Sequence, residues 1–144
     1  MSDRALIYGT IAIDTLITPA GQVNSVLGGS GVYAALAARL ITAETDLVGV
    51  VGDDFPNEFS LALEARGISL QHVDRVPGRT FSWTGKYEKD MNLRTTVETV
   101  EGVQEHWRIC LPEKLKQARL VVATNVTPPL QYRLVEQCRD AQFV

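Results

Sequence analysis

The chain has 144 residues, of which 45% are hydrophobic and 22% are charged, and its formal net charge at pH 7 is −3. These values are typical of one soluble globular domain and exclude a disordered or fibrous chain. The acidic balance provides no excess of positive charge for a phosphate backbone, so we expect no nucleic-acid binding.

No apolar run approaches the roughly 20 residues that span a bilayer, and the N-terminus lacks the pattern of a signal peptide. The two cysteines, Cys110 and Cys138, form neither a C-x-x-C pair nor a disulfide framework, which favours a reducing compartment. We therefore expect a cytoplasmic protein with no membrane segment.

Residues 5–8 are apolar and predict a buried strand, and residues 11–17 predict a second strand in which Asp14 stands among apolar residues. A turn separates this segment from a short strand of mixed polarity over residues 23–27. The alanine-rich stretch 30–41 predicts a helix that packs closely against a sheet.

Residues 46–51 are almost wholly apolar, as in a central parallel strand that is buried on both faces. Asp54 is expected to cap the next helix, which has Pro56 in its first turn and Gly67 as its stop. Residues 68–76 predict another strand. This alternation of strands and helices is typical of an α/β fold with a parallel sheet.

The next stretch breaks that alternation. Residues 80–87 alternate strictly, and residues 93–100 are rich in threonine and valine, which together predict a two-faced antiparallel hairpin. One face carries Phe81, Trp83 and Tyr87. These rings could stack on a sugar, contact another subunit, or simply belong to the core.

Towards the C-terminus, the sequence predicts a short helix over 114–117, a buried strand over 120–123 and a helix over 130–139. A loop over 124–129 joins the last two. Residues 141–144 then begin what looks like a further strand, so we expect an interrupted alternation.

The run Gly28-Gly29-Ser30-Gly31, at a predicted junction from strand to helix, is the strongest chemical signal in the chain. Glycines let a ligand approach the backbone, and the first amides of a helix favour an anion or a hydroxyl. A tight turn without a ligand is the plain alternative. Residues 29–34 also fit the dinucleotide fingerprint G-x-G-x-x-A, with Asp53 after the next strand, but the preceding strand is too polar for that fold.

A buried carboxylate such as Asp14 needs partners or a ligand, and it can accept protons from two sugar hydroxyls. A salt bridge or a turn cap is the alternative. His72 and His106 are isolated and lack metal-ligand spacing, and neither cysteine has a local base, so we expect no metal site and no nucleophile.

Together these residues resemble the PfkB or ribokinase family of carbohydrate and nucleoside kinases. Residues 9–14 look like the family's first strand, whose aspartate binds substrate hydroxyls. Residues 28–38 look like its first signature, a di-glycine that opens an alanine-rich helix, and residues 48–55 look like the next strand and its turn. The predicted hairpin corresponds to a lid sheet that covers the sugar and, in many members, forms a dimer interface.

The resemblance implies a ribokinase-like α/β fold, in which helices flank a parallel sheet and a small antiparallel β lid comes from segments about 11–27 and 80–100. Residues 1–144 would be the N-terminal part of one such domain. Family members are much longer, and their second signature, D-T-x-G-A-G-D, does not occur here. We therefore expect the substrate-side half of an ATP-dependent sugar kinase, which binds substrate without catalysing transfer on its own.

For the complete family member the resemblance implies ATP and Mg²⁺, a sugar or polyol as substrate, and a homodimer through the lid. It implies no catalytic residue in this chain. Tyr33 and Ala12 stand where many members have asparagines that contact ribose, which argues against ribose or a nucleoside. The alternatives are a non-catalytic binding or dimerisation module, or a dinucleotide-binding domain. The implied substrate-binding residues are Asp14, Gly28, Gly29, Ser30, Tyr33, Trp83, Arg94 and Asn125.

Overall fold

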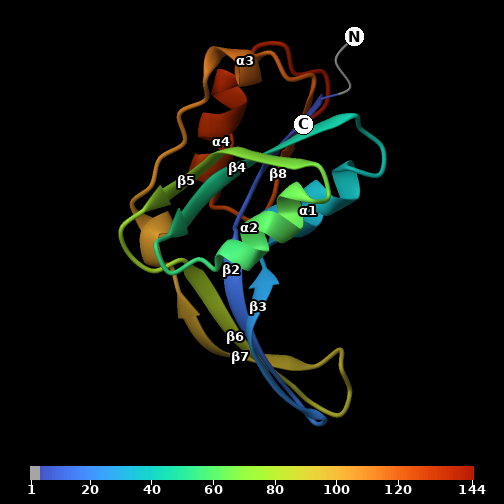
Figure 1. Ribbon diagram of the computed structural model, residues 1–144, viewed down its shortest axis with the longest axis vertical. Helices are drawn as coiled ribbons and strands as arrows, with labels where there is room; N and C mark the ends of the chain where they lie inside the picture. Colours follow the sequence, from blue (N-terminus) through green and yellow to red (C-terminus); the bar gives the residue numbers. More distant parts are fainter. Residues whose placement is uncertain (1–3) are drawn as a thin grey trace.

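The computed structural model describes residues 4–144, which form two sheets (Figure 1). Four parallel strands make the first sheet in the order β5-β4-β1-β8, so the predicted α/β fold is confirmed. The strands of this parallel sheet are β1 (Arg4–Tyr8), β4 (Glu44–Gly52), β5 (Ile68–Val76) and β8 (Leu120–Ala123).

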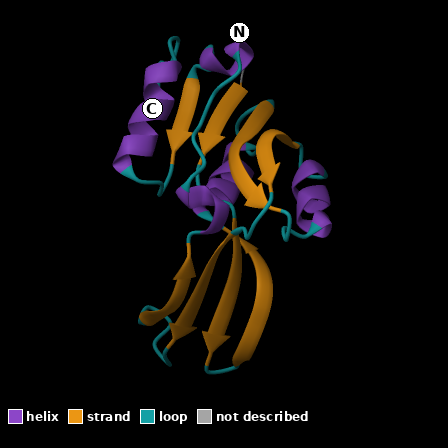
Figure 2. Cartoon of the chain, turned by 90° about the vertical axis from the view of Figure 1, so that its left-hand side faces the viewer, coloured by secondary structure: helices purple, strands orange, loops and turns teal. Residues whose placement is uncertain are grey.

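Helices cover both faces of the parallel sheet (Figure 2). Because successive side chains of a strand point to opposite faces, Ile7 packs in the core beneath α1 and α2, whereas Leu6 packs in the core beneath α3 and α4. The helices are α1 (Ser30–Ala38), α2 (Asn57–Glu64), the short 3₁₀ helix η1 (Gly102–Glu105), α3 (Glu113–Lys116) and α4 (Pro128–Gln137). No helix in the described part of the chain is long and apolar enough to cross a membrane.

The second sheet, which we call the mixed sheet, projects from one end of the parallel sheet (Figures 1 and 2). Its order is β3-β2-β6-β7. The hairpin of residues 80–100 is antiparallel, as predicted, and β2 and β3 also pair in the antiparallel direction. Strands β2 and β6, which join the hairpins, run parallel. The strands are β2 (Ala12–Thr18), β3 (Gly21–Gly28), β6 (Phe81–Tyr87) and β7 (Arg94–Val100).

Two local expectations were wrong. Asp54 does not cap α2, which begins after Pro56, because its carboxylate instead accepts hydrogen bonds from Thr80. Residues 141–144 form no strand, and only an isolated bridge joins Phe143 to β8. Gly67 lies just beyond the end of α2 with a φ of 76°, as expected for a glycine stop.

Candidate functional site

Glycines allow the link between β1 and β2 to lie against the start of α1. Gly29 has a φ of 100°, and a side-chain carbon there would come within 2.2 Å of the Thr10 carbonyl oxygen. A carbon on Gly9 would meet Thr124 Oγ1 at 1.8 Å. The Gly31 amide donates to Thr10 O at 3.0 Å, so this amide is used within the fold and is not a donor for a ligand.

Polar side chains meet beside these glycines, at the carboxyl end of the parallel sheet. Ser30 Oγ lies 2.7 Å from Thr124 Oγ1 and donates to Asn125 Oδ1. Thr124 Oγ1 in turn donates to the carbonyl of Tyr8 at 3.1 Å. The start of α1 is thereby joined to the loop after β8, and two of the predicted site residues, Ser30 and Asn125, are in contact.

Asp14 carries the one buried side-chain oxygen or nitrogen that lacks a hydrogen-bond partner within residues 4–144, namely its Oδ1. Burial raises the pKa of the Asp14 carboxyl above its usual value, while a hydrogen bond from the backbone of Trp83 lowers it. Its other oxygen lies over Gly28, where a side-chain carbon would approach it to 1.9 Å. An unsatisfied buried acceptor of this kind is suited to a hydroxyl of a bound ligand.

Trp83 lies beside Asp14, because the two residues are paired between β6 and β2. Its ring covers Gly85, where a side-chain carbon would approach the ring to 2.0 Å, and its Nε1 donates to Thr96 Oγ1 at 3.1 Å. The Arg94 guanidinium carbon lies 6.0 Å from the centre of the ring. The contacts of Trp83 and Arg94 are therefore within the mixed sheet, and neither residue belongs to the core of the parallel sheet.

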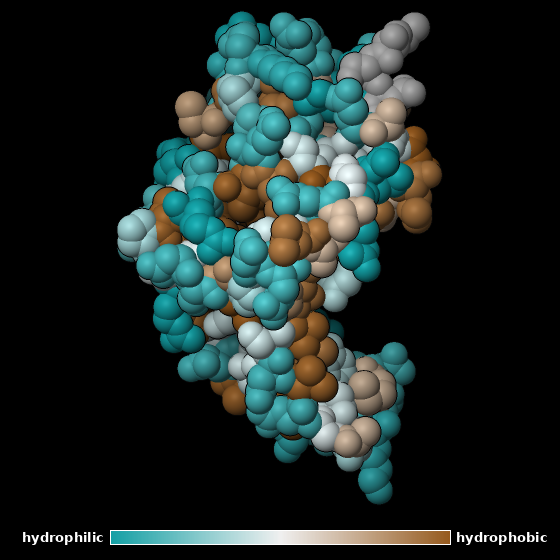
Figure 3. All heavy atoms as spheres, viewed as in Figure 1, coloured by the Kyte–Doolittle hydropathy of each residue, from teal (hydrophilic) through white to brown (hydrophobic). Residues whose placement is uncertain are grey.

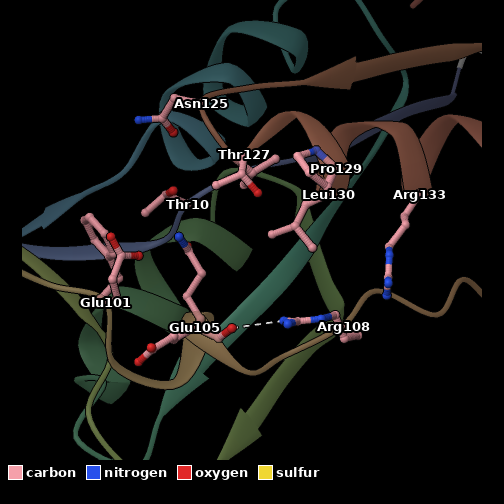
Figure 4. A pocket seen from close by; sticks show the side chains of 12 residues that line it. Thr10, Glu101, Glu105, Arg108, Asn125, Thr127, Pro129, Leu130 and Arg133 are labelled. Carbon is pink, nitrogen blue, oxygen red and sulfur yellow. Dashed lines mark hydrogen bonds between the residues drawn. The ribbon is translucent and has the colours of Figure 1, made fainter.

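A pocket of about 460 Å³ lies between the start of the mixed sheet, η1 and the loop from β8 to α4. Thr10, Phe81 and Asn125 line one part of it. The charged lining residues are Glu101, Glu105, Arg108 and Arg133. Figure 4 shows the two glutamates on one side, Arg133 on the other and Arg108 between them. The pocket thus combines acceptors and donors with the apolar side chains of Phe81 and Leu130.

The structure distributes the predicted residues over two neighbouring groups. Asp14, Gly28, Trp83 and Arg94 belong to the mixed sheet, whereas Gly29, Ser30 and Asn125 lie at the edge of the parallel sheet. Tyr33, with 62% of its surface exposed on α1, is neither in the core nor in the lining of the pocket. Thr10, Gln104 and the four charged residues, which also line the pocket, were not among the site residues predicted from the sequence.

Comparisons with known proteins give one consistent class. The chain is 30% identical to a cytidine kinase of Thermococcus kodakarensis over 135 residues, which cover 93% of the chain and 48% of the relative. The solved nucleoside kinase of Methanocaldococcus jannaschii, an archaeal member of the ribokinase family, matches with a TM-score of 0.77 at 15% identity, over 96% of this chain and 50% of that one. No family model matches the sequence.

The ribokinase of Arabidopsis thaliana, solved with ribose and ATP, matches with a TM-score of 0.74 at 18% identity, over 99% of this chain and 52% of that chain. The chain therefore has the ribokinase fold, and its predicted resemblance to the PfkB or ribokinase family is confirmed. It spans about half the length of the relatives that it matches.

The fold does not support the dinucleotide interpretation of residues 29–34. That fingerprint requires the glycines to follow a strand of the parallel sheet. Here they follow β3, which lies at the edge of the mixed sheet and is paired with β2.

Proposed function

We propose that this chain forms the acceptor-binding side of a kinase that transfers the γ-phosphate of ATP to a hydroxyl of a sugar or nucleoside. The observation that carries the proposal is the buried, unpartnered Oδ1 of Asp14 at the junction of the two sheets. A charged carboxylate in such surroundings forms a strong hydrogen bond with a hydroxyl donor. The similarity to kinases that carry the names of a nucleoside and of ribose supports this choice of acceptor.

In this proposal Asp14 accepts a hydrogen bond from the acceptor and orients it. Ser30 and Asn125 offer further polar contacts, and Trp83 closes one side of the site. Closure of the mixed sheet over the acceptor would exclude water, which competes with the acceptor for the phosphoryl group. The mixed sheet would thus act as the lid.

We assign no residue of this chain to ATP or Mg²⁺. Within residues 4–144 there is no cluster of three or more histidine, cysteine, aspartate or glutamate side chains that could hold a metal ion. The sequence also contains no D-T-x-G-A-G-D segment. The function that we propose for this chain is therefore to bind and orient the acceptor, and no proton transfer is assigned to it.

Between the two acceptor classes, the pocket favours a nucleoside. With the ribose hydroxyls at Asp14, the 460 Å³ pocket beyond Asn125 offers space for a base. A base also requires polar groups at its edge. A carboxylate accepts a hydrogen bond from the exocyclic amino group of cytosine. A guanidinium donates hydrogen bonds to the carbonyl oxygen and the ring nitrogen of cytosine. Glu105 and Arg108 supply both kinds of group. Tyr33, in place of the asparagine typical of ribose-binding members, favours the sugar alternative.

Calorimetric titration of the protein with cytidine, ribose and fructose tests the choice of acceptor. We expect cytidine to bind most tightly. Tighter binding of a free sugar would support the second candidate, and binding of none of them would contradict the proposed function. Asp14→Asn should weaken the binding of cytidine, whereas Glu88→Gln, which removes an exposed carboxylate from the far end of the β6–β7 hairpin, is the control and should not.

We further propose that two copies associate through the mixed sheet and that the protein acts in the cytoplasm. Valines 23 and 97 in the mixed sheet each expose more than half of their surface, and β3 and β7 are its edge strands. Figure 3 shows hydrophobic side chains at the surface of the lower part of the molecule, where the mixed sheet lies. An isolated sheet of hairpins gains stability when a second copy covers such side chains.

A further inference from the structure

A carboxylate outside the proposed site holds the beginning of β6. Asp54 Oδ1 accepts hydrogen bonds from both the amide and the hydroxyl of Thr80, at 2.7 and 2.6 Å. Thr80 Oγ1 accepts a third hydrogen bond, at 2.9 Å, from the amide of Gly52 at the end of β4. Thr80 is only 1% exposed, so its hydroxyl finds all its partners in this turn.

The rest of the hairpin base is fixed in the same way. The Asp53 amide donates to Gly78 O at 3.1 Å, just before β6. The Val103 amide, just after β7, donates to Arg79 O at 2.8 Å. Gly102 makes this approach possible with a φ of 57°, because a side-chain carbon there would lie 2.2 Å from Arg79 O. The entry of the hairpin is therefore tied to the turn after β4, and its exit is tied to the entry.

The register shifts of the mixed sheet lie farther out along its strands. One falls between Asp14 and Leu16 where β2 pairs with β3, and the other between Thr84 and Gly85 where β6 pairs with β7. Leu16 and Gly85 are themselves paired between β2 and β6, so the two shifts lie at one level across the sheet. Bulges of this kind bend a sheet, whereas the base of the hairpin is held by hydrogen bonds.

Phe81, which lines the pocket, directly follows Thr80. We propose that Asp54 is a positioning residue for the acceptor site, because through Thr80 it fixes Phe81, and Trp83 two residues later, relative to the parallel sheet. This inference rests on the proposed function. Asp54 itself does not touch the acceptor.

The test uses the protein as it occurs in the cell and four variants. Thr80→Val removes the hydroxyl at nearly constant volume, and Thr80→Ser keeps it. Asp54→Ala removes the acceptor, and Asp54→Asn keeps a carbonyl oxygen in its place. Loss of hydrogen bonds to a charged group should raise the dissociation constant for the acceptor roughly tenfold in Thr80→Val and Asp54→Ala. Thr80→Ser and Asp54→Asn should retain most of the wild-type affinity for the acceptor.

Amide hydrogen exchange provides a second readout that does not depend on activity. In Thr80→Val and Asp54→Ala, amides of residues 80–87 should exchange faster, while those of residues 5–8 should not change. If Thr80→Val fails to fold, the Asp54→Ala variant still tests the proposal. The Asp54 side chain lies at the surface, so we expect its removal to leave the fold intact. An unchanged dissociation constant for the acceptor, with only a lower melting temperature, would overturn the proposal. If the wild type binds no acceptor, the proposed function fails, and unchanged exchange in residues 80–87 would then separately reject the role of Asp54.

Discussion

The carboxylate of Asp14 lies directly over the backbone of Gly28. A side-chain carbon at position 28 would approach Asp14 Oδ2 to 1.9 Å, and the other carboxylate oxygen is buried without a partner. The second glycine, Gly29, similarly admits the backbone of Thr10. The two glycines therefore make room for different neighbours. Gly28 makes room for the side chain of Asp14 in the proposed site, and Gly29 makes room for the backbone of the link between β1 and β2.

Replacement of Gly28 by alanine should displace the Asp14 carboxylate and weaken acceptor binding. The loss should approach that of removing the carboxylate, about 1.5–3 kcal/mol for a hydrogen bond to a charged group. The measurement is a titration of the protein with the acceptor. In the background Asp14→Ala, the substitution Gly28→Ala should have little further effect, because the clash is gone. Additive losses in the double variant would show that Gly28 acts independently of Asp14.

The pKa of Asp14 predicts how stability depends on pH. Burial raises this pKa in the folded state, so the folded protein holds the proton more tightly than the unfolded chain. The charged carboxylate therefore destabilises the folded protein. The resulting loss of stability is absent below the pKa that Asp14 has in the unfolded chain, and it develops as pH rises through the pKa that Asp14 has in the folded protein. Asp14→Asn should be more stable than the wild type at neutral pH.

Thermal unfolding of both proteins between acid and neutral pH checks this prediction. The difference in melting temperature should grow as pH rises above the usual aspartate range. The control is Glu88→Gln, in which an exposed carboxylate is removed. A wild-type protein that is more stable than Asp14→Asn at neutral pH would indicate that Asp14 has a stabilising partner.

Much of the fold could be predicted because its signals are local. The strict alternation of residues 80–87 indicated a two-faced strand, and the apolar run 46–51 indicated a buried parallel one. Asp54 shows the limit of such reasoning. Its position before Pro56 suggested a helix cap, but Thr80, which is distant in the sequence, competes successfully for the carboxylate.

The candidate site was predictable only in part, for the same physical reason. Asp14 and the glycines carry local signals, a charge in an apolar strand and a glycine-rich junction. The charged residues of the pocket come from η1, the segment after it and α4, which are ordinary polar surface sequences when read alone. Parallel strands bring such segments together only after long crossovers. No local sequence pattern therefore predicts that these segments come together near Asn125.

Tyr33 should influence the choice of acceptor without supporting the fold. Its side chain is 62% exposed, so Tyr33→Asn should change stability by no more than about 0.5 kcal/mol. If the ring reaches the acceptor when the lid closes, Tyr33→Asn should raise the affinity for ribose relative to the affinity for the preferred acceptor. Titrations with the two acceptors measure this ratio. An unchanged ratio would remove Tyr33 from the site.

Association through the mixed sheet can be tested at Val97, which exposes 57% of its surface on β7. A charge buried in an interface without a partner is costly, so Val97→Arg should shift the protein from dimer to monomer. Sedimentation velocity at several concentrations gives the oligomeric state. Leu61→Arg, at an exposed position on α2, is the matched control and should leave the dimer intact. A dimer that survives Val97→Arg would place the interface elsewhere.

The central claim is that Asp14 binds a hydroxyl of the acceptor, and calorimetric titration tests it most directly. The wild type and Asp14→Asn are each titrated with cytidine, ribose, fructose and NAD. We predict that the wild type binds cytidine, that Asp14→Asn weakens this binding by about 1.5–3 kcal/mol, and that neither protein binds NAD. Equal affinity of the two proteins for every nucleoside and sugar, or binding of NAD alone, would contradict the account.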